Sequence, residues 1–432
     1  MKTVFSSLQW LFFILAQAII TPIAIGHSFH MSPQEIAELL QRTFLVIGVS
    51  GLLQTLFGHR LPISEGPAGL WWGVFIIYAG LVASGSLSTA RGLQELEMGM
   101  LICGALFILL GLLKWMEPVK KLFTPLVTGT YLLLLVSQLS GSFVKGIAGI
   151  GYSSGHFNGK VAACACIVVI ISIFFSKSNV KFLNSYSLLL SLLIGWALFG
   201  LLGLTKHDSY SGQWISVPKW FAWGLPQFSS GILVTSIFIG LLLLANMVAT
   251  INVVEKTYKN AKVSTTPIPF NRVTVMMGIN TWIAGIFSAV ACVPISATAG
   301  FILTTKIYQR LPFLIGSMIM LVVSFFPALT HFFANLPAPV GYATMFLPFS
   351  SLIAIAFNEY RLLNFTENTS LIISISLMIG IGSLFIPASA LTGLPSLLTT
   401  ILNNGLVLGM IVCMILERVL KNKEAAPLRR DH

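Results

Sequence analysis

Charged residues are scarce in this chain of 432 residues: they make up 9% of it, whereas 56% of the residues are hydrophobic. Soluble proteins contain roughly 25% charged residues. The mean hydropathy of +0.90 agrees with the shortage of charge. The composition therefore excludes a soluble protein and predicts an all-α polytopic membrane protein. No linker or low-complexity tract interrupts the sequence, so we expect a single membrane domain over residues 1–432.

The chain also lacks the motifs of catalysis and of metal binding. It contains no HExxH sequence, no Walker loop, no Ser/His/Asp constellation in one accessible region and no CxxC pair. Its five cysteines lie in or beside apolar segments, where packing is their expected role. We therefore expect no enzyme, no cofactor and no bound metal.

Basic residues outnumber acidic ones, giving a net charge of +12. Most of the 25 lysines and arginines fall in alternate loops, on one side of the predicted membrane. This skew follows the positive-inside rule and places both termini in the cytoplasm, in a multi-pass protein of the plasma membrane. The same placement argues against nucleic acid as a partner and identifies the lipid bilayer as one.

Apolar segments of about membrane-crossing length, roughly 20 residues, divide the chain into fourteen predicted transmembrane spans. They are 8–26, 38–57, 66–84, 98–114, 122–140, 160–176, 184–204, 230–250, 273–291, 295–308, 311–328, 338–357, 369–389 and 393–416.

One short motif occurs twice. Residues 61–69 read LPISEGPAG, and residues 293–300 read VPISATAG. Each copy is a Pro/Gly/Ser-rich break beside an apolar segment. Irregular backbone at membrane depth is tolerated only inside protein or along a wet cavity, and paired breaks in two halves of a transporter indicate its binding site. The alternative is that both copies form ordinary loops.

The breaks also suggest a local geometry. A helix starting near Pro67 would begin in mid-membrane, and Ser296 or Thr298 would cap a second helix starting near Ala299. The two helix N-termini would then face each other. Their free N–H groups and positive dipole ends would attract carbonyl oxygens or anions.

Ionisable residues inside a membrane are functional candidates. Of the thirteen acidic residues, only Glu65 is expected to reach the membrane interior, and the seven histidines fall in loops, turns or the tail. Uncharged polar residues within spans more often bond neighbouring helices than ligands. They are Gln17, Gln54, Gln138, Asn246, Asn252 and Asn280.

Several segments together resemble the nucleobase-ascorbate transporter family, also called nucleobase:cation symporter-2. The most specific match is residues 123–130, which are similar to the fifth-span signature. The other matching segments are 7–12, 51–54, 60–62, 248–254, 297–306 and 336–341. The resemblance implies fourteen spans in two inverted seven-span repeats, with the third and tenth spans each broken into a short strand plus a half-helix.

The resemblance also implies a mechanism. A core domain moves against a gate domain and carries purines, pyrimidines, urate or ascorbate, often with protons or sodium. By position the core here is residues 1–121 and 230–330, and the gate is residues 122–229 and 331–416. Residues 417–432 form a basic cytoplasmic tail. A homodimer is expected from the resemblance alone.

The chain departs from the family where a base would be bound. The first-span Gln-His is Gln9-Trp10, the eighth-span acidic residue is Leu242, and the aromatic residue after the third-span break is Gly69. The tenth-span signature has Ala297 and Thr298 in place of its usual Glu or Gln and Asn. The eighth-span and tenth-span positions that usually hold the edge of the base therefore both lack a carboxylate or amide.

We hypothesise that Glu65 supplies the missing carboxylate and also couples transport to protons. The alternative is that Glu65 is a solvated charge in the cytoplasmic mouth. The full set of candidate substrate-binding residues is Gln17, Glu65, Ala68, Gly69, Asn246, Ser296, Ala297, Thr298 and Gly300.

The leading functional prediction is a nucleobase permease of the purine or uracil/xanthine type that works by alternating access with proton coupling. Loss of the acidic residues leaves a carrier of a small anion on the same fold as the runner-up. A transport-inactive membrane sensor is an alternative of a different class, and it would bind a ligand without moving it.

Overall fold

The structure is a computed structural model. It describes residues 2–116, 118, 124–152, 156–205, 210, 212–387, 390, 398, 402 and 404–425. Three predicted features lie wholly or largely outside these described residues. They are Phe123 of the fifth-span signature, most of residues 393–403 in the last predicted span, and the tail from residue 426 onward.

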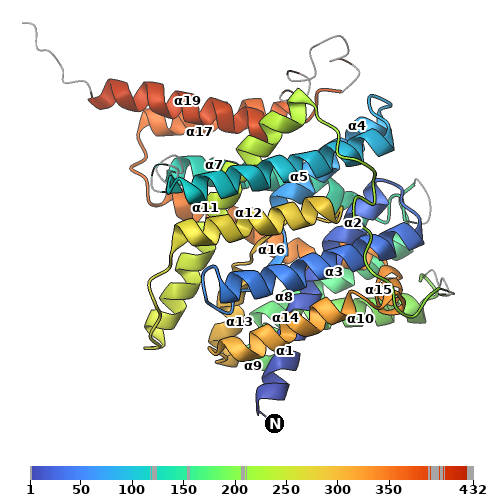
Figure 1. Cartoon of the computed structure of the whole chain (residues 1–432). Coiled ribbons are helices and arrows are strands. Elements are labelled where there is room, and N and C mark those ends of the chain that lie inside the picture. The colour runs from blue at the N-terminus through green and yellow to red at the C-terminus, as the bar shows by residue number, and fades with distance from the viewer. Residues whose placement is uncertain are drawn as a thin grey trace, which may run out of the picture.

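The regular secondary structure of the described chain consists of helices, many of them labelled in Figure 1, and two short strands. The first half contains α1 (Lys2–Ala18), α2 (Ile20–Ser28), α3 (Pro33–Leu56), β1 (Glu65–Pro67), α4 (Gly69–Ala83), α5 (Thr89–Leu112), α7 (Pro125–Ile147), α8 (Gly159–Lys177), α9 (Lys181–Ser185) and α10 (Ser187–Leu201). The second half contains α11 (Ser230–Asn260), α12 (Phe270–Ile286), β2 (Cys292–Pro294), α13 (Ala297–Thr305), α14 (Arg310–Val323), α15 (Pro327–Ala334), α16 (Ala338–Tyr360), α17 (Glu367–Ser383) and α19 (Gly405–Ala425).

A described helix overlaps each of the fourteen predicted spans. Within the described residues, seven helices are long and apolar enough to cross a membrane, or eight if one bent pair counts as a single span. These helices make the chain a multi-pass membrane protein. The count of fourteen remains a prediction, because several of the remaining helices are shorter than a full crossing.

The bent pair corrects one predicted boundary. The sequence predicts a single span over 311–328, but α14 ends at Val323 and α15 begins at Pro327, at an angle of 92° to it. Proline has no N–H to continue a helix, yet it fits the first helical turn. Pro327 therefore starts a new helix in a new direction.

Local sequence signals explain where several helices begin. Ser32 caps α3 through a complete capping box: its hydroxyl accepts from the Glu35 N–H, and the Glu35 carboxylate accepts from the Ser32 N–H at 2.7 Å. Thr124 caps α7 just before Pro125, and Asn158 caps α8. These side chains satisfy N–H groups that the first helical turn leaves free.

Close backbone contact joins α5 to α12, which lie side by side in Figure 1. A Cβ atom added to Gly278 would lie 2.7 Å from the carbonyl oxygen of Gly104, and one added to Gly104 would lie 2.8 Å from that of Gly278. Further along, a Cβ on Gly111 would lie 2.7 Å from the carbonyl oxygen of Asn271. Small residues let membrane helices approach this closely.

The helices pack in two groups. In the first group α3 packs against α14 and α12, α5 packs against α12 and α11, and α1 packs against α14. In the second group α16 packs against α7 and α8, and α17 packs against α19 and α7. The contacts between α16 and α2 and between α4 and α7 join the two groups.

Replacing Gly278 with alanine tests the α5–α12 contact. We expect Gly278→Ala to destabilise the fold by about 1–3 kcal/mol, because the new methyl group meets backbone that cannot rotate away. The measurement is the thermal unfolding midpoint of the purified protein in detergent. The matched control is Gly141→Ala in α7, where nothing lies within 4 Å of the added Cβ. If both variants melted alike, the contact would have no energetic importance.

Candidate functional site

The two copies of the repeated motif meet in space. Strands β1 and β2 pair antiparallel, with Glu65 opposite Pro294 and Pro67 opposite Cys292. Two further backbone hydrogen bonds extend the pair: the Ala68 N–H donates to the Ala291 carbonyl, and the Ile295 N–H donates to the Ser64 carbonyl, both at 2.9 Å. Backbone pairing therefore satisfies both breaks and brings the starts of α4 and α13 together.

Neither of these two helices has a side-chain cap. The structure starts α4 at Gly69 rather than near Pro67, and α13 at Ala297 rather than near Ala299. Ala68 has no polar side chain, and Ser296 already has helical backbone angles, so its hydroxyl makes no capping bond. The predicted capping by Ser296 or Thr298 is therefore wrong. Neither helix has a side-chain cap, and in α13 the N–H groups of Thr298 and Ala299 donate instead to the backbone carbonyls of Ile295 and Ser296, both at 3.1 Å.

Thr298 instead ties the two breaks together. Its hydroxyl, which is buried, accepts a hydrogen bond from the backbone N–H of Ser64 at 3.2 Å. The two residues are 234 positions apart in the chain. Thr298 therefore contributes to the geometry of the strand pair, and its hydroxyl keeps one hydrogen to donate and one lone pair.

Gln17 lies against one face of β1. A Cβ atom on Gly66 would lie 3.1 Å from Ile295 and 3.8 Å from the Gln17 side-chain oxygen. Both polar atoms of the Gln17 amide are buried and have no hydrogen-bond partner. Buried amides are normally paired, so this one is a donor and an acceptor available beside the strand pair.

Glu65 faces the other side, because successive strand residues point to opposite faces. Its carboxylate is buried, and neither oxygen has a hydrogen-bond partner. The imidazole of His59 lies next to it, with Nε2 at 3.6 Å from Oε1. The structure therefore brings Glu65 and Gln17 to the same strand but not to the same face.

An aromatic ring lies beside Gly69. The ring of Phe349 in α16 would be 3.5 Å from a Cβ atom on Gly69. Phe349 also packs against Trp72 in α4 and Phe143 in α7, with ring centroids 5.2 and 4.8 Å away. Where the family resemblance implies an aromatic side chain at Gly69, a ring from another helix takes the adjacent space.

The remaining predicted residues lie on the elements around the strand pair. Ala68 is fully buried where β1 leads into α4, whereas Ser296, Ala297 and Gly300 are exposed at the start of α13. Asn246 is half-buried within α11, a helix that packs against β2 and α13.

The sequence of this chain matches known permeases over most of its length. The profile of the Permease family, Xan_ur_permease, matches residues 1–389. A Bacillus subtilis protein named "Putative purine permease YwdJ" is 41% identical over 417 residues, which cover 96% of this chain and 95% of that protein. The chain belongs to the nucleobase-ascorbate transporter family. It is therefore a permease and not an enzyme.

More distant relatives and solved structures agree with this assignment. The xanthine permease of Bacillus subtilis is 24% identical over 433 aligned positions, covering 97% of this permease and 93% of that one. The transmembrane domain of the cyanobacterium bicarbonate transporter BicA has the same fold, with a TM-score of 0.61, 17% identity, and coverage of 94% of this chain and 96% of that domain.

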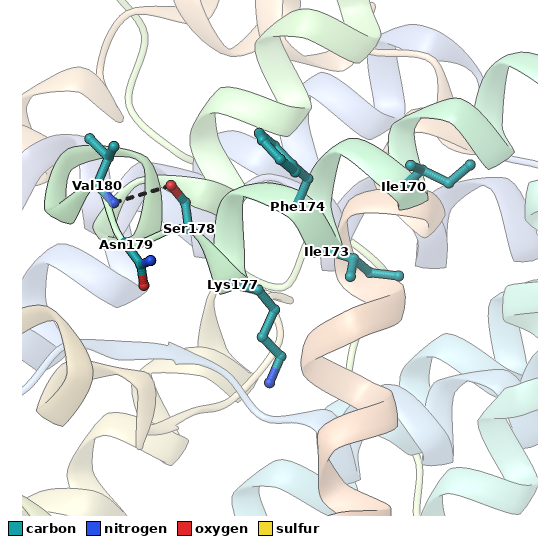
Figure 2. A pocket seen from close by; sticks show the side chains of 7 residues that line it. All are labelled: Ile170, Ile173, Phe174, Lys177, Ser178, Asn179 and Val180. Atoms are coloured by element: carbon teal, nitrogen blue, oxygen red, sulfur yellow. Dashed lines mark hydrogen bonds between the residues drawn. The ribbon is translucent and has the colours of Figure 1, made fainter.

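Two surface pockets are lined by none of the predicted substrate residues. One of about 670 Å³ is shown in Figure 2, where Ile170, Ile173 and Phe174 project from α8 and Lys177 marks the end of that helix. The other, of about 410 Å³, is lined by residues including Leu61, Tyr258 and Arg310. The strand pair itself is enclosed by protein.

Sequence reasoning missed several buried ionisable residues in this permease, among them His59 and Glu97. His59 was assigned to a loop, but its side chain is fully buried beside Glu65. Glu97 was assigned to a span end, yet α5 begins eight residues earlier and buries it completely. Glu97 accepts a hydrogen bond from Ser288, whose carbonyl accepts from Arg42 at 3.2 Å. Ser88 is the cap of α5. Recognising Ser88 as a cap in the sequence would start this helix earlier and place Glu97 inside it.

Metal ligands are not gathered anywhere in the described part of the permease. No group of three or more His, Cys, Asp or Glu side chains there is arranged to hold a metal ion.

Substitution of Thr298 tests the bond between the two breaks. We expect Thr298→Val to cost about 1–3 kcal/mol of stability, because the buried Ser64 N–H loses its acceptor. Thr298→Ser keeps the hydroxyl and should restore most of that stability. Thermal unfolding in detergent gives both values. Equal unfolding midpoints for the Val and Ser variants would contradict the role of this hydrogen bond.

Proposed function

We propose that this permease carries a nucleobase, of the purine or uracil/xanthine type, across the cytoplasmic membrane by alternating access. The observation that carries the proposal is the pair of helix starts, α4 and α13, held together by β1 and β2 without side-chain caps. The positive dipole ends of these two helix N-termini attract carbonyl oxygens. Oxopurines and uracil present such oxygens on a flat ring.

Gln17 and Phe349 suit the same class of ligand. The amide of Gln17 offers one donor group and one acceptor, both unpaired, and a base edge presents both kinds of partner. Phe349 offers a flat apolar surface beside Gly69, on which a planar ring can stack. The names of the relatives, a purine permease and a xanthine permease, support a base as the cargo.

Alternating access would proceed by movement of a core, residues 1–121 and 230–330, against a gate, residues 122–229 and 331–416. The two packing groups of helices support this division. The ring contact between Trp72 of α4 and Phe349 of α16 would lie at the boundary and change as the core moves. Both termini would be cytoplasmic, as the distribution of basic residues indicates.

Glu65 is the proposed proton carrier. Its carboxylate is buried and has no hydrogen-bond partner, and a charge in such a place is costly. A carboxyl group in this setting gains a proton readily in one state and releases it when its surroundings become wetter or more polar. Proton uptake and release at Glu65 would then accompany substrate movement.

A small anion is the second candidate substrate. Leu242 and Ala297 stand where family members carry acidic or amide groups, so no carboxylate at these positions would repel an anion from the helix starts. The solved bicarbonate transporter shares the fold. The anion would occupy the same position between α4 and α13.

Uptake into proteoliposomes separates these functions. We expect radiolabelled xanthine, hypoxanthine, urate or uracil to enter, and an inward proton gradient to increase the rate. An unlabelled base should compete, whereas sulfate and bicarbonate should not. Inhibition by the anions alone would replace the base with an anion, and binding without uptake would indicate a sensor.

Replacement of Glu65 tests proton coupling. We expect Glu65→Gln to abolish stimulation by the proton gradient and the pH dependence of uptake, while exchange of labelled for unlabelled base continues, because the amide has no proton to release. The matched control is Glu367→Gln, at an exposed position in the first turn of α17. Unchanged pH dependence in Glu65→Gln would remove Glu65 from the coupling mechanism.

A further inference from the structure

The pair formed by His59 and Glu65 is enclosed by protein. The exposed fractions of the two side chains are 0% and 1%, and the nearest approach of the pair is 3.6 Å, between Nε2 and Oε1. Neither carboxylate oxygen has another partner. A charged carboxylate at such a place needs a donor or a counter-charge, and His59 is the group within reach.

A backbone hydrogen bond determines which nitrogen of His59 carries the proton. The Leu61 N–H donates to Nδ1 at 3.1 Å, so Nδ1 acts as an acceptor and holds no hydrogen. In a neutral imidazole the single hydrogen is then on Nε2. Nε2 is the atom that faces Glu65, so the fold aims a fixed N–H donor at the carboxylate.

The surrounding groups favour a neutral ring. The guanidinium of Arg310 in α14 acts electrostatically on His59, and burial disfavours a charge on the imidazole. The other ionisable group that acts on the carboxyl side is the thiol of Cys292 in β2. His59 therefore stays an uncharged donor, and the proton that comes and goes is the one on Glu65.

We infer that His59 is a positioning residue for Glu65, which it stabilises in the charged form by donation from Nε2. The inference rests on the proposed proton coupling. When Glu65 gives its proton to water, its carboxylate becomes negative and attracts the Nε2–H. The separation of 3.6 Å exceeds hydrogen-bond length, as expected for a pair that tightens only when Glu65 is charged. His59 thereby sets the pH at which Glu65 exchanges its proton.

One surface pocket is lined by a residue that contacts this pair. The pocket of about 410 Å³ is lined by Leu61, Tyr258, Tyr308 and Arg310. Leu61 is the residue whose backbone N–H holds the His59 ring. Leu61 therefore connects this pocket to His59, and water in the pocket is the proposed source and acceptor of the proton.

The test is the pH profile of base uptake by full-length protein in proteoliposomes. We expect His59→Leu to move the midpoint of the profile upward by about one pH unit or more, because the carboxylate loses its donor and stays protonated to higher pH. His59→Gln carries an N–H at a similar reach and should return the midpoint close to that of the wild type. His59→Asn is polar but too short, and should behave like His59→Leu.

Three comparisons decide the outcome. His156→Leu, the same change at an exposed histidine, should leave the midpoint unchanged. If the Leu variant does not fold, Gln against Asn still decides: equal midpoints for these two, or no shift in either Leu or Asn, would overturn the positioning role. Wild-type protein that moves no base at any pH would instead overturn the proposed function, and the role of His59 with it.

Discussion

The antiparallel contact between β1 and β2 is the constraint on which the rest of this structure depends. Two non-helical segments are buried together, where their backbone groups cannot turn to water. They satisfy each other: the Ala68 and Ile295 N–H groups donate across the pair, and the Thr298 hydroxyl accepts from Ser64. Pro67 and Pro294 have no N–H to satisfy at all. Because the strands are paired, the starts of α4 and α13 are held together and left uncapped.

Contacts between the helices of this fold differ in kind. Helices α5 and α12 touch through the backbone of Gly104 and Gly278. Helix α4 meets α7 and α16 through the rings of Trp72, Phe143 and Phe349. Side chains can change rotamer, so ring contacts can adjust to a displacement that backbone contacts cannot follow. This contrast suits the proposed movement of a rigid core against a gate.

Buried polar groups in the permease form hydrogen bonds between residues that are far apart in the chain. Arg42 donates to the Ser288 carbonyl, 246 residues away, and Ser288 donates to Glu97 across 191 residues. His59 and Glu65, by contrast, are close in sequence and meet because the segment between α3 and β1 folds back on itself. In each case a group that would be costly to bury alone has a partner that the tertiary fold provides.

The sequence by itself determined the membrane class, the family and the places where helices give way to strands. Composition and hydropathy indicate whether water or lipid surrounds the chain. The repeated Pro/Gly/Ser motif indicates a backbone that cannot remain helical. Tertiary structure alone decided that Glu65 faces His59, that Phe349 lies beside Gly69, and that Thr298 holds Ser64 rather than capping a helix. Each of these depends on which distant segment packs against the residue or how a loop folds back. A side chain's neighbours across the fold, unlike its solvent preference, leave no periodic pattern in a single sequence.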